Sequence, residues 1–397
     1  MQTAFKAAVT NFEQLSTTTT AASVIDVKGF GNFTTVNLTG AAATQTLNNL
    51  ATGDTINIIG ANTGVTAAGS SGAGVDTINV TLTNSGAALA AFSTVTLPNT
   101  DIIVVRSLDT QTTPVGYQNT LTLVDTSAST LTVTGNSGVT ITATGMTALT
   151  SVDASTLASP TANSTIGLSI TADALLYAST VRGSVNGNDT LNFAAALVAT
   201  TITSTAGTNA ITGSSTIAST LTGGSGADTI VGGAGADTIN GGAGNDIITG
   251  GAGADTINVG SGTDTIKLAT VNAETQVGIV ATGFTVTGDV ITGMGNGDKI
   301  DLATGGGTAG GTFADGAITV GTTFATATAN LMAIVSGSYD TATKVFTAGA
   351  ASATNNDYVF QYNGGATATT VNSIVLVDII GTVTATSATE VITLTVV

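Results

Sequence analysis

The chain has 397 residues, of which 24 are acidic and 7 basic, so its formal net charge is −17; it contains no Cys, His or Trp. Without Cys and His, the usual zinc, haem and iron–sulfur sites are excluded, as are Ser-His-Asp triads and thiol nucleophiles. So few cations also cannot form the basic surface that binding of nucleic acid requires. The metal chemistry that remains is the binding of a hard cation by oxygen ligands, which points first to calcium.

The first zone, residues 1–180, is rich in Thr, Ala and Val. In residues 120–145, apolar residues alternate with Thr or Ser, and Gly or Asn interrupts the alternation. This pattern predicts short strands with one buried face, and hence an all-β domain built as a Thr-rich β-sandwich or β-solenoid. The few segments with helical character are residues 3–15, 88–93, 193–199 and 324–335.

The second zone, residues 181–305, is rich in Gly and Asp and contains an internal repeat. Five nonapeptides follow one another from residue 223 to 267; four match Gly-Gly-x-Gly-x-Asp-x-Ile-x, and the fifth has Val259 in place of the first Gly. A flexible Gly-rich linker would not keep Asp and Ile in phase, so we interpret the segment as folded. The repeated aspartates are Asp228, Asp237, Asp246, Asp255 and Asp264.

The nonapeptide spacing predicts a parallel β-roll. We expect the first six residues of each repeat to form a turn and the last three a short strand with its Ile inward, so that two repeats complete one coil. Coils then stack ~4.8 Å apart, which aligns Asp228 with Asp246, Asp246 with Asp264, and Asp237 with Asp255. Carboxylates this close repel one another unless a cation lies between them, and calcium also accepts backbone carbonyls. At least three ions are expected, and Asp246 alone is shared by two pairs.

The repeat resembles the RTX family, whose nonapeptides form a calcium-binding parallel β-roll. The resemblance implies several bound Ca²⁺ ions held by the five aspartates and by glycine carbonyls. The candidate glycines are Gly224, Gly226, Gly233, Gly235, Gly242, Gly244, Gly251 and Gly253.

Two degenerate copies flank the array. Residues 183–193 carry Asn188 and Asp189, and residues 290–302 carry Asp298 and Asp301. The second copy resembles the closing coil of RTX rolls in serralysin-type proteases, although Met294 stands where that family often has an aromatic residue. These four residues join the candidate calcium ligands.

The third zone, residues 306–397, returns to Thr-rich strands and is expected to be a C-terminal β domain. Its final segment, TEVITLTVV, would suit an uncleaved signal for type I secretion. The order of Thr-rich strands, nonapeptides and C-terminal strands resembles RTX-containing bacterial surface-layer proteins. That resemblance implies an extracellular protein of the bacterial cell surface, which self-assembles with calcium into a two-dimensional surface (S-) layer lattice.

The partners expected from this resemblance are further copies of the chain, with cell-surface polysaccharide or lipopolysaccharide as the anchor; no membrane span is expected. The alternative is an RTX adhesin or secreted binding module, in which the β-roll serves only folding and secretion. We expect no enzyme and no catalytic residue. The best acid/base candidates, Asp298 with Asp301 or Asp289, belong to the closing repeat, where calcium binding or turn capping explains them better.

Overall fold

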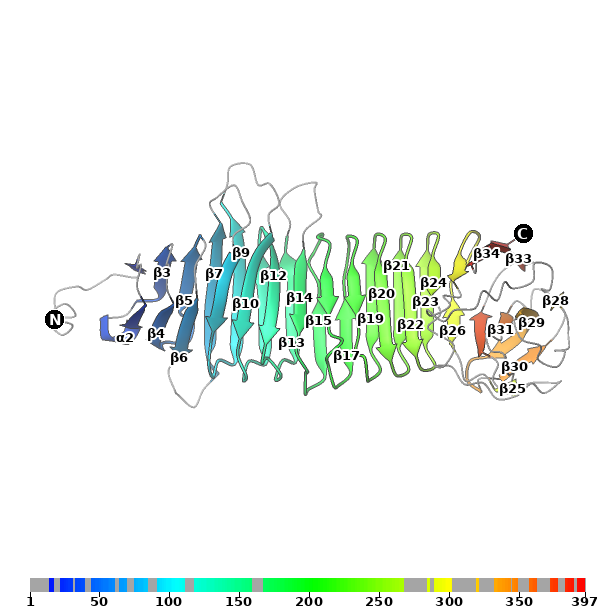
Figure 1. Cartoon of the computed structure of the whole chain (residues 1–397), viewed down its shortest axis with the longest axis horizontal. Helices are drawn as coiled ribbons and strands as arrows, with labels where there is room; N and C mark the ends of the chain where they lie inside the picture. The colour runs from blue at the N-terminus through cyan, green and yellow to red at the C-terminus, as the bar shows by residue number, and fades with distance from the viewer. Residues whose placement is uncertain are drawn as a thin grey trace, which may run out of the picture. The chain divides into compact units, whose positions relative to one another are not determined.

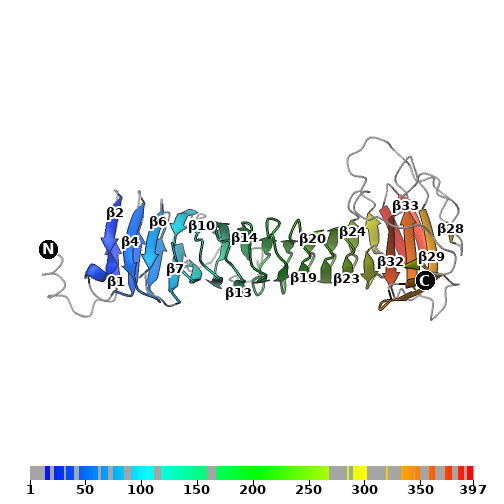
Figure 2. The same cartoon turned by 90° about the horizontal axis from the view of Figure 1, so that it is seen from below.

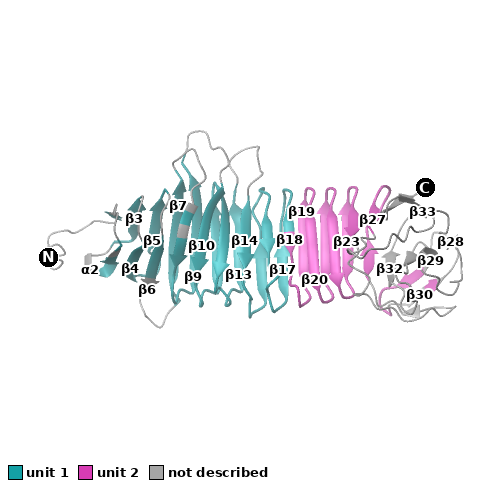
Figure 3. Ribbon diagram, in the orientation of Figure 1, with its two compact units in different colours: residues 1–210 teal, residues 211–397 magenta. Residues whose placement is uncertain are grey.

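The computed structural model describes residues 14–17, 22–30, 33–39, 44–60, 64–69, 75–84, 91–110, 118–158, 167–267, 284–285, 289–301, 319–320, 332–343, 345–348, 357–362, 372–377, 383–388 and 391–396. The chain divides into two compact units, residues 1–210 and residues 211–397 (Figure 3). Within the described residues, all elements are β-strands apart from one short helix, α2 (Val27–Phe30).

Unit 1 is a parallel β-solenoid in which successive strands alternate between two sheets (Figure 1). Sheet A contains β1 (Gln14–Thr17), β3 (Thr35–Thr39), β5 (Thr55–Ile59), β7 (Thr77–Asn84), β9 (Ile102–Asp109), β11 (Thr130–Gly135), β13 (Ser151–Leu157), β15 (Ser179–Arg182) and β17 (Thr200–Thr203). Sheet B contains β2 (Ser23–Asp26), β4 (Gln45–Leu50), β6 (Val65–Gly69), β8 (Ala91–Thr96), β10 (Gln118–Val124), β12 (Gly138–Thr144), β14 (Leu168–Ala172) and β16 (Thr190–Asn192). The division between the units falls in β18 (Ala210–Thr212).

The alternation of apolar residues and Thr builds these coils. In sheet B, Leu121 pairs with Ile141 of the next coil, and Ile141 pairs with Ile170; all three are buried. Neighbouring Thr residues such as Thr120 and Thr140 are also in register, but on the outer face. Successive side chains of a strand point to opposite faces, so one residue type fills the core and the other keeps the outside polar without charge.

Within unit 2, the strands of the nonapeptides also alternate between two sheets (Figure 2). Its roll strands are β19 (Thr220–Ser225), β20 (Thr229–Ala234), β21 (Thr238–Ala243), β22 (Ile247–Ala252), β23 (Thr256–Ser261), β24 (Thr265–Lys267), β26 (Val290–Thr292) and β27 (Lys299–Asp301). The repeated Ile residues stack in two columns, and every member is at most 1% exposed. One column is Leu221, Ile239, Ile257 and Ile291, and the other is Ile230, Ile248, Ile266 and Ile300.

The remaining strands of unit 2 pair mainly in antiparallel fashion. They are β25 (Phe284–Thr285), β28 (Thr319–Val320), β29 (Met332–Asp340), β30 (Val345–Ala348), β31 (Asp357–Tyr362), β32 (Asn372–Val377), β33 (Val383–Ala388) and β34 (Val391–Val396). Strand β32 pairs with β26, and β34 pairs with β27. Both edge strands of the roll are therefore covered, which removes the open edges that invite unwanted strand pairing.

The strands bear on two groups of expectations from the sequence. The expected domain boundary at residue 180 falls inside β15, which pairs with β13 of the preceding coil, so the strand pattern runs on without a break. The expected boundary at residues 305–306 lies outside the described residues. The expected helical character is wrong wherever these segments are described. Residues 193–199 form a corner between β16 and β17 in which Phe193 and Ala196 are buried. Residues 91–93 lie in β8, and residues 332–335 lie in β29.

Candidate metal centre

Each nonapeptide forms a longer strand and a tighter turn than its sequence suggested. Strand β21 ends at Ala243 and β22 begins at Ile247, so only Gly244, Asn245 and Asp246 remain for the turn. The strands include the Gly-Gly pair, and Gly224 is in register with Gly242 of the next coil. The expected division into six turn residues and three strand residues is therefore wrong.

The aspartates form two ladders, one at each corner of the roll. In the first ladder, the backbone N–H of Asp228 donates to Oδ1 of Asp246 (2.9 Å), that of Asp246 to Asp264 (2.8 Å), and that of Asp264 to Asp298 (2.8 Å). The predicted alignment of carboxylates 18 residues apart is present, and Asp298 extends it.

In the second ladder, the N–H of Ser219 donates to Oδ1 of Asp237 (2.6 Å), that of Asp237 to Asp255 (2.8 Å), and that of Asp255 to Asp289 (2.8 Å). Asp289 was expected to belong to the closing repeat but was not included among the candidate ligands. It lies nine residues before Asp298 and two before Ile291, which is the spacing of the repeat, so the sequence did contain the signal.

Among the residues that the structure describes, nothing hydrogen-bonds to the second oxygen of four ladder carboxylates. Oδ2 is buried without a partner in Asp237, Asp246, Asp255 and Asp264, each of which is at most 1% exposed. A buried carboxylate oxygen without a partner is unfavourable, because it has lost its water and gained no replacement. A bound cation would supply the partner that these four oxygen atoms lack.

The orphaned oxygens face the first glycine of the motif. A Cβ atom at Gly241 would lie 2.6 Å from Oδ2 of Asp246 and would also overlap the carbonyl oxygen of Val259. A Cβ atom at Gly232 would likewise overlap Oδ2 of Asp237 and the carbonyl oxygen of Gly250. Carboxylate and carbonyl oxygens thus converge on a space that only glycine leaves open. The carbonyl donors expected from the sequence are those of the second and third glycines, and the carbonyls at the first position of the repeat, such as those of Gly250 and Val259, were missed.

The second and third glycines have a different role, which is to allow the coils to approach. At Gly242 φ is +110°, and a Cβ would overlap the carbonyl oxygen of Gly224 in the preceding coil. Side chains rarely adopt such angles. Positive φ is shared by all eight glycines expected to donate carbonyls, namely Gly224, Gly226, Gly233, Gly235, Gly242, Gly244, Gly251 and Gly253.

Burial disfavours the charged form of the ladder carboxylates. It raises the pKa of Asp237 to about 7, with a further contribution from the charge of Asp255. It raises the pKa of Asp264 to about 6, with smaller contributions from Asp298 and Asp246. The pKa values of Asp246 and Asp255 are also raised, mainly by burial. A cation between successive coils would reverse this effect, because it favours the charged form.

The residues fit calcium. Their donors are oxygen atoms only, from carboxylates and backbone carbonyls, which is the ligand set that calcium accepts at high coordination number. Within the described part of the chain, no group of three or more His, Cys, Asp or Glu side chains could hold a metal ion. Carbonyls must therefore supply much of the coordination, as the glycine-lined space at each ladder step allows.

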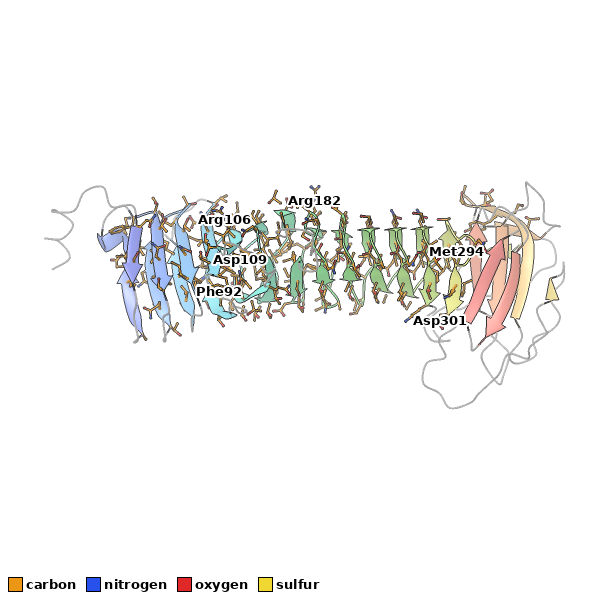
Figure 4. All side chains as sticks on the ribbon, turned by 90° about the horizontal axis from the view of Figure 1, so that it is seen from above. Phe92, Arg106, Asp109, Arg182, Met294 and Asp301 are labelled. Carbon is orange, nitrogen blue, oxygen red and sulfur yellow. The ribbon has the colours of Figure 1, made fainter. Side chains whose placement is uncertain are left out.

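The three other candidate residues differ from the ladders. Asp301 lies on β27 in register with Lys267 and is only half-buried (Figure 4), whereas Asp298 precedes that strand. Asp189 lies in unit 1 and is buried, but hydrogen-bond donors surround both of its oxygens. The side chain of Asn188 accepts the N–H of Thr208 (2.7 Å), as Asn245 accepts that of Thr263 in the repeat.

Comparison with known families bears directly on this segment. The family defined as the RTX calcium-binding nonapeptide repeat (4 copies) matches residues 218–248 and 231–266. The chain carries an RTX repeat segment. RTX nonapeptides bind calcium, and the matched residues, hereafter the RTX segment (residues 218–266), contain all five repeated aspartates. No curated protein gives a significant sequence match to the chain.

The described residues contain no helix that is long and apolar enough to cross a membrane.

Proposed function

We propose that the protein is an exported structural protein of the bacterial cell surface, which folds with calcium and assembles with copies of itself into an S-layer lattice. The observation that carries the proposal is the pair of carboxylate ladders with buried, unpartnered Oδ2 atoms. A cation that binds only the folded roll stabilises it by mass action. Calcium is scarce inside cells and abundant outside, so this roll would complete its fold after export.

The surface of the coils supports a structural role. The outward positions of strands β10, β12 and β14 hold Thr, Ser, Gln or Val and no charged residue, although the chain as a whole carries a net charge of −17. Faces of this kind approach one another without the repulsion that a charged face of one sign would create. Self-association is therefore the partnership that we propose, with cell-surface polysaccharide or lipopolysaccharide as the anchor and type I secretion as the route.

Catalysis is not part of the proposal. Asp289 and Asp298, which the sequence offered as an acid/base pair, belong to separate ladders. The exposed side chains of Arg106 and Arg182 lie on β9 and β15, with β11 and β13 between those strands in sheet A (Figure 4). Neither arrangement brings together an acid, a base and a nucleophile.

Electron microscopy of the purified protein, with and without calcium, tests the proposal. We expect ordered sheets in calcium, which disperse on chelation and return when calcium is restored. Monodisperse particles in saturating calcium would contradict lattice formation. They would favour the alternative, an RTX adhesin or secreted binding module, provided that calorimetry on the same sample still showed calcium binding.

A further inference from the structure

Asp189 occupies the same structural position as the ladder aspartates. Its backbone N–H donates to Oδ1 of Asn209 in the next coil (2.9 Å), as the N–H of Asp228 donates to Oδ1 of Asp246. A Cβ at Gly183 would overlap Oδ2 of Asp189, as a Cβ at Gly241 would approach Oδ2 of Asp246. Asp189 is also as buried, at 1% exposure.

The hydrogen bonds of Asp189 are nevertheless different. Oδ1 accepts the N–H of Leu168 (2.8 Å) and the hydroxyl of Ser184 (2.7 Å). Oδ2 accepts the N–H of Ser184 (2.9 Å) and the hydroxyl of Ser204 (2.7 Å). A carboxylate has about four acceptor sites, and here four donors use them. No lone pair remains for a cation.

Serines at two motif positions account for this difference. Ser184 follows Gly183 as the second glycine of the repeat follows the first. Ser204 stands at the first position in the next coil, because the residue before it, Thr203, pairs with Arg182 and accepts the N–H of Gly183. It precedes Asn209 by five residues, as Gly223 precedes Asp228. Both serines are almost fully buried. Where the repeat has Gly, the pocket beside the carboxylate is open; where Ser replaces it, the hydroxyl fills the pocket and donates to the carboxylate.

A third serine of this kind occurs within unit 2. Ser214 follows Gly213, and its hydroxyl accepts the N–H groups of Thr216 and Ile217 (3.2 and 3.1 Å). Its own N–H donates to the hydroxyl of Ser219 (3.0 Å), and Ser219 stands where the repeat has Asp. In this turn, the hydroxyl of Ser219 takes the place of the repeat's carboxylate. The hydroxyl of Ser214 lies where a cation would bind in the repeat.

We propose that Asp189 is closed to calcium and that its coil is held instead by the hydroxyls of Ser184 and Ser204, so that calcium dependence begins only at the RTX segment. The serine turns at residues 183–189 and 203–209 are then calcium-independent versions of the RTX turn. The inference rests on calcium binding by the RTX segment and is independent of lattice formation.

Native mass spectrometry of the full chain provides the first test, because it counts bound calcium ions. We expect Asp189→Asn to bind as many ions as the unmodified chain, whereas the matched change Asp246→Asn in the first ladder binds fewer. Loss of an ion from Asp189→Asn would overturn the proposal.

The double variant Ser184→Ala/Ser204→Ala provides a second test, which holds even if Asp189→Asn folds poorly. It removes both hydroxyl donors and keeps the carboxylate. By hydrogen exchange of the full chain, we expect the amides of β14–β16 to have the same protection with and without calcium in the unmodified chain, and to lose protection in chelator in the double variant. If calcium raised the protection of β14–β16 in the unmodified chain, or if the double variant kept full protection in chelator, the proposal would be wrong. A lattice that fails to form would leave both readouts unaffected.

Discussion

Asp246 accepts the backbone N–H of Asp228 at Oδ1, 2.9 Å away and one coil earlier, while its Oδ2 has no hydrogen-bond partner among the described residues. The fold thus uses one oxygen of the carboxylate to join two coils and leaves the other facing the space at Gly241, which the carbonyl oxygen of Val259 also lines. A substitution of Asp246 can keep the oxygen that joins the coils and replace the one that faces the open space. This makes Asp246 the most informative residue to change.

Asp246→Asn is expected to have opposite effects with and without calcium. The amide oxygen can keep the bond to Asp228, but the NH₂ group cannot bind a cation. In calcium, we expect the free energy of unfolding to fall by about 1–3 kcal/mol, the range for loss of an interaction with a charged group. In a chelator it should rise, because a buried negative charge has been removed. Urea unfolding in both buffers measures this, and the same sign in both would contradict it.

Asp301→Asn is the matched control for the ladder, since Asp301 lies on a strand opposite Lys267 and not at the corner. We expect its effect to stay within about 0.5 kcal/mol in either buffer, as for a surface position. The sequence singled out Asp246 because two pairs share it. The structure gives Asp255 and Asp264 the same standing, since each lies between two ladder neighbours. Their Asn variants should match Asp246→Asn.

Chelation should unfold the RTX segment and spare unit 1. Without a cation, the orphaned carboxylates of the ladders oppose folding, whereas the polar groups around Asp189 satisfy one another. Hydrogen exchange should therefore show lost protection in β20–β23 and retained protection in β10–β14. Magnesium should restore little of it, because it demands six ligands at shorter distance and releases its water reluctantly. Full protection of β20–β23 in chelator would contradict this expectation.

The calcium-free protein should become less stable as pH rises from about 4 to about 7. Burial raises the pKa of Asp237 to about 7 and that of Asp264 to about 6, above the ordinary value of 3.8, so the folded state binds protons more tightly than the unfolded state. The free energy of unfolding therefore falls as these protons are lost. Denaturation in chelator across this range measures the slope, and Asp237→Asn should flatten it. Because calcium competes with these protons, its affinity should rise over the same interval.

Gly242→Ala should disrupt the roll regardless of calcium. Its φ of +110° disfavours any side chain, and the new Cβ would overlap the carbonyl oxygen of Gly224. We expect a loss of at least about 2–3 kcal/mol, from backbone strain and steric overlap together. Gly295→Ala is the control, since nothing lies within 4 Å of its added Cβ. Thermal unfolding of both variants compares them; equal melting temperatures would contradict the interpretation.

The sequence was sufficient to predict the ladders because each coil of the RTX segment has the same length. Asp and Ile then recur in phase, and stacking follows from the spacing alone. Unit 1 has the same parallel architecture, but its coils vary in length: Thr35 pairs with Thr55, 20 residues later, whereas Val152 pairs with Val181, 29 residues later. This variation hides the period, so a sandwich and a solenoid could not be distinguished from composition and alternation.

Residue spacing alone does not predict every contact of the site residues. The spacing of Asp289 to Asp298 and Ile291 matches the repeat, but Asp289 follows Asp255 by 34 residues because additional residues separate β24 from β26. Its pairing with Asp255 in the ladder therefore required the fold. Asp189 carries the motif of a ligand, but its donors Leu168 and Ser204 come from neighbouring coils. No local pattern reports which side chains the next coil will supply.

The direction of the ladder bonds gives the array a polarity. Every ladder N–H points to a carboxylate that follows it in the chain, and Asp298 ends the series by accepting the N–H of Gly295 in its own turn (2.7 Å) at Oδ2. Trimming the roll from its C-terminal side would strand buried N–H donors at Asp255 and Asp264, which proteins rarely tolerate. Trimming from the other side would free a ladder carboxylate oxygen, which water or a cation can serve, but it would also remove the carbonyl of Asp228, which accepts the N–H of Ile247 (2.8 Å). Either shortened end therefore needs a cap, and only the C-terminal cap must supply an acceptor for the ladder N–H groups.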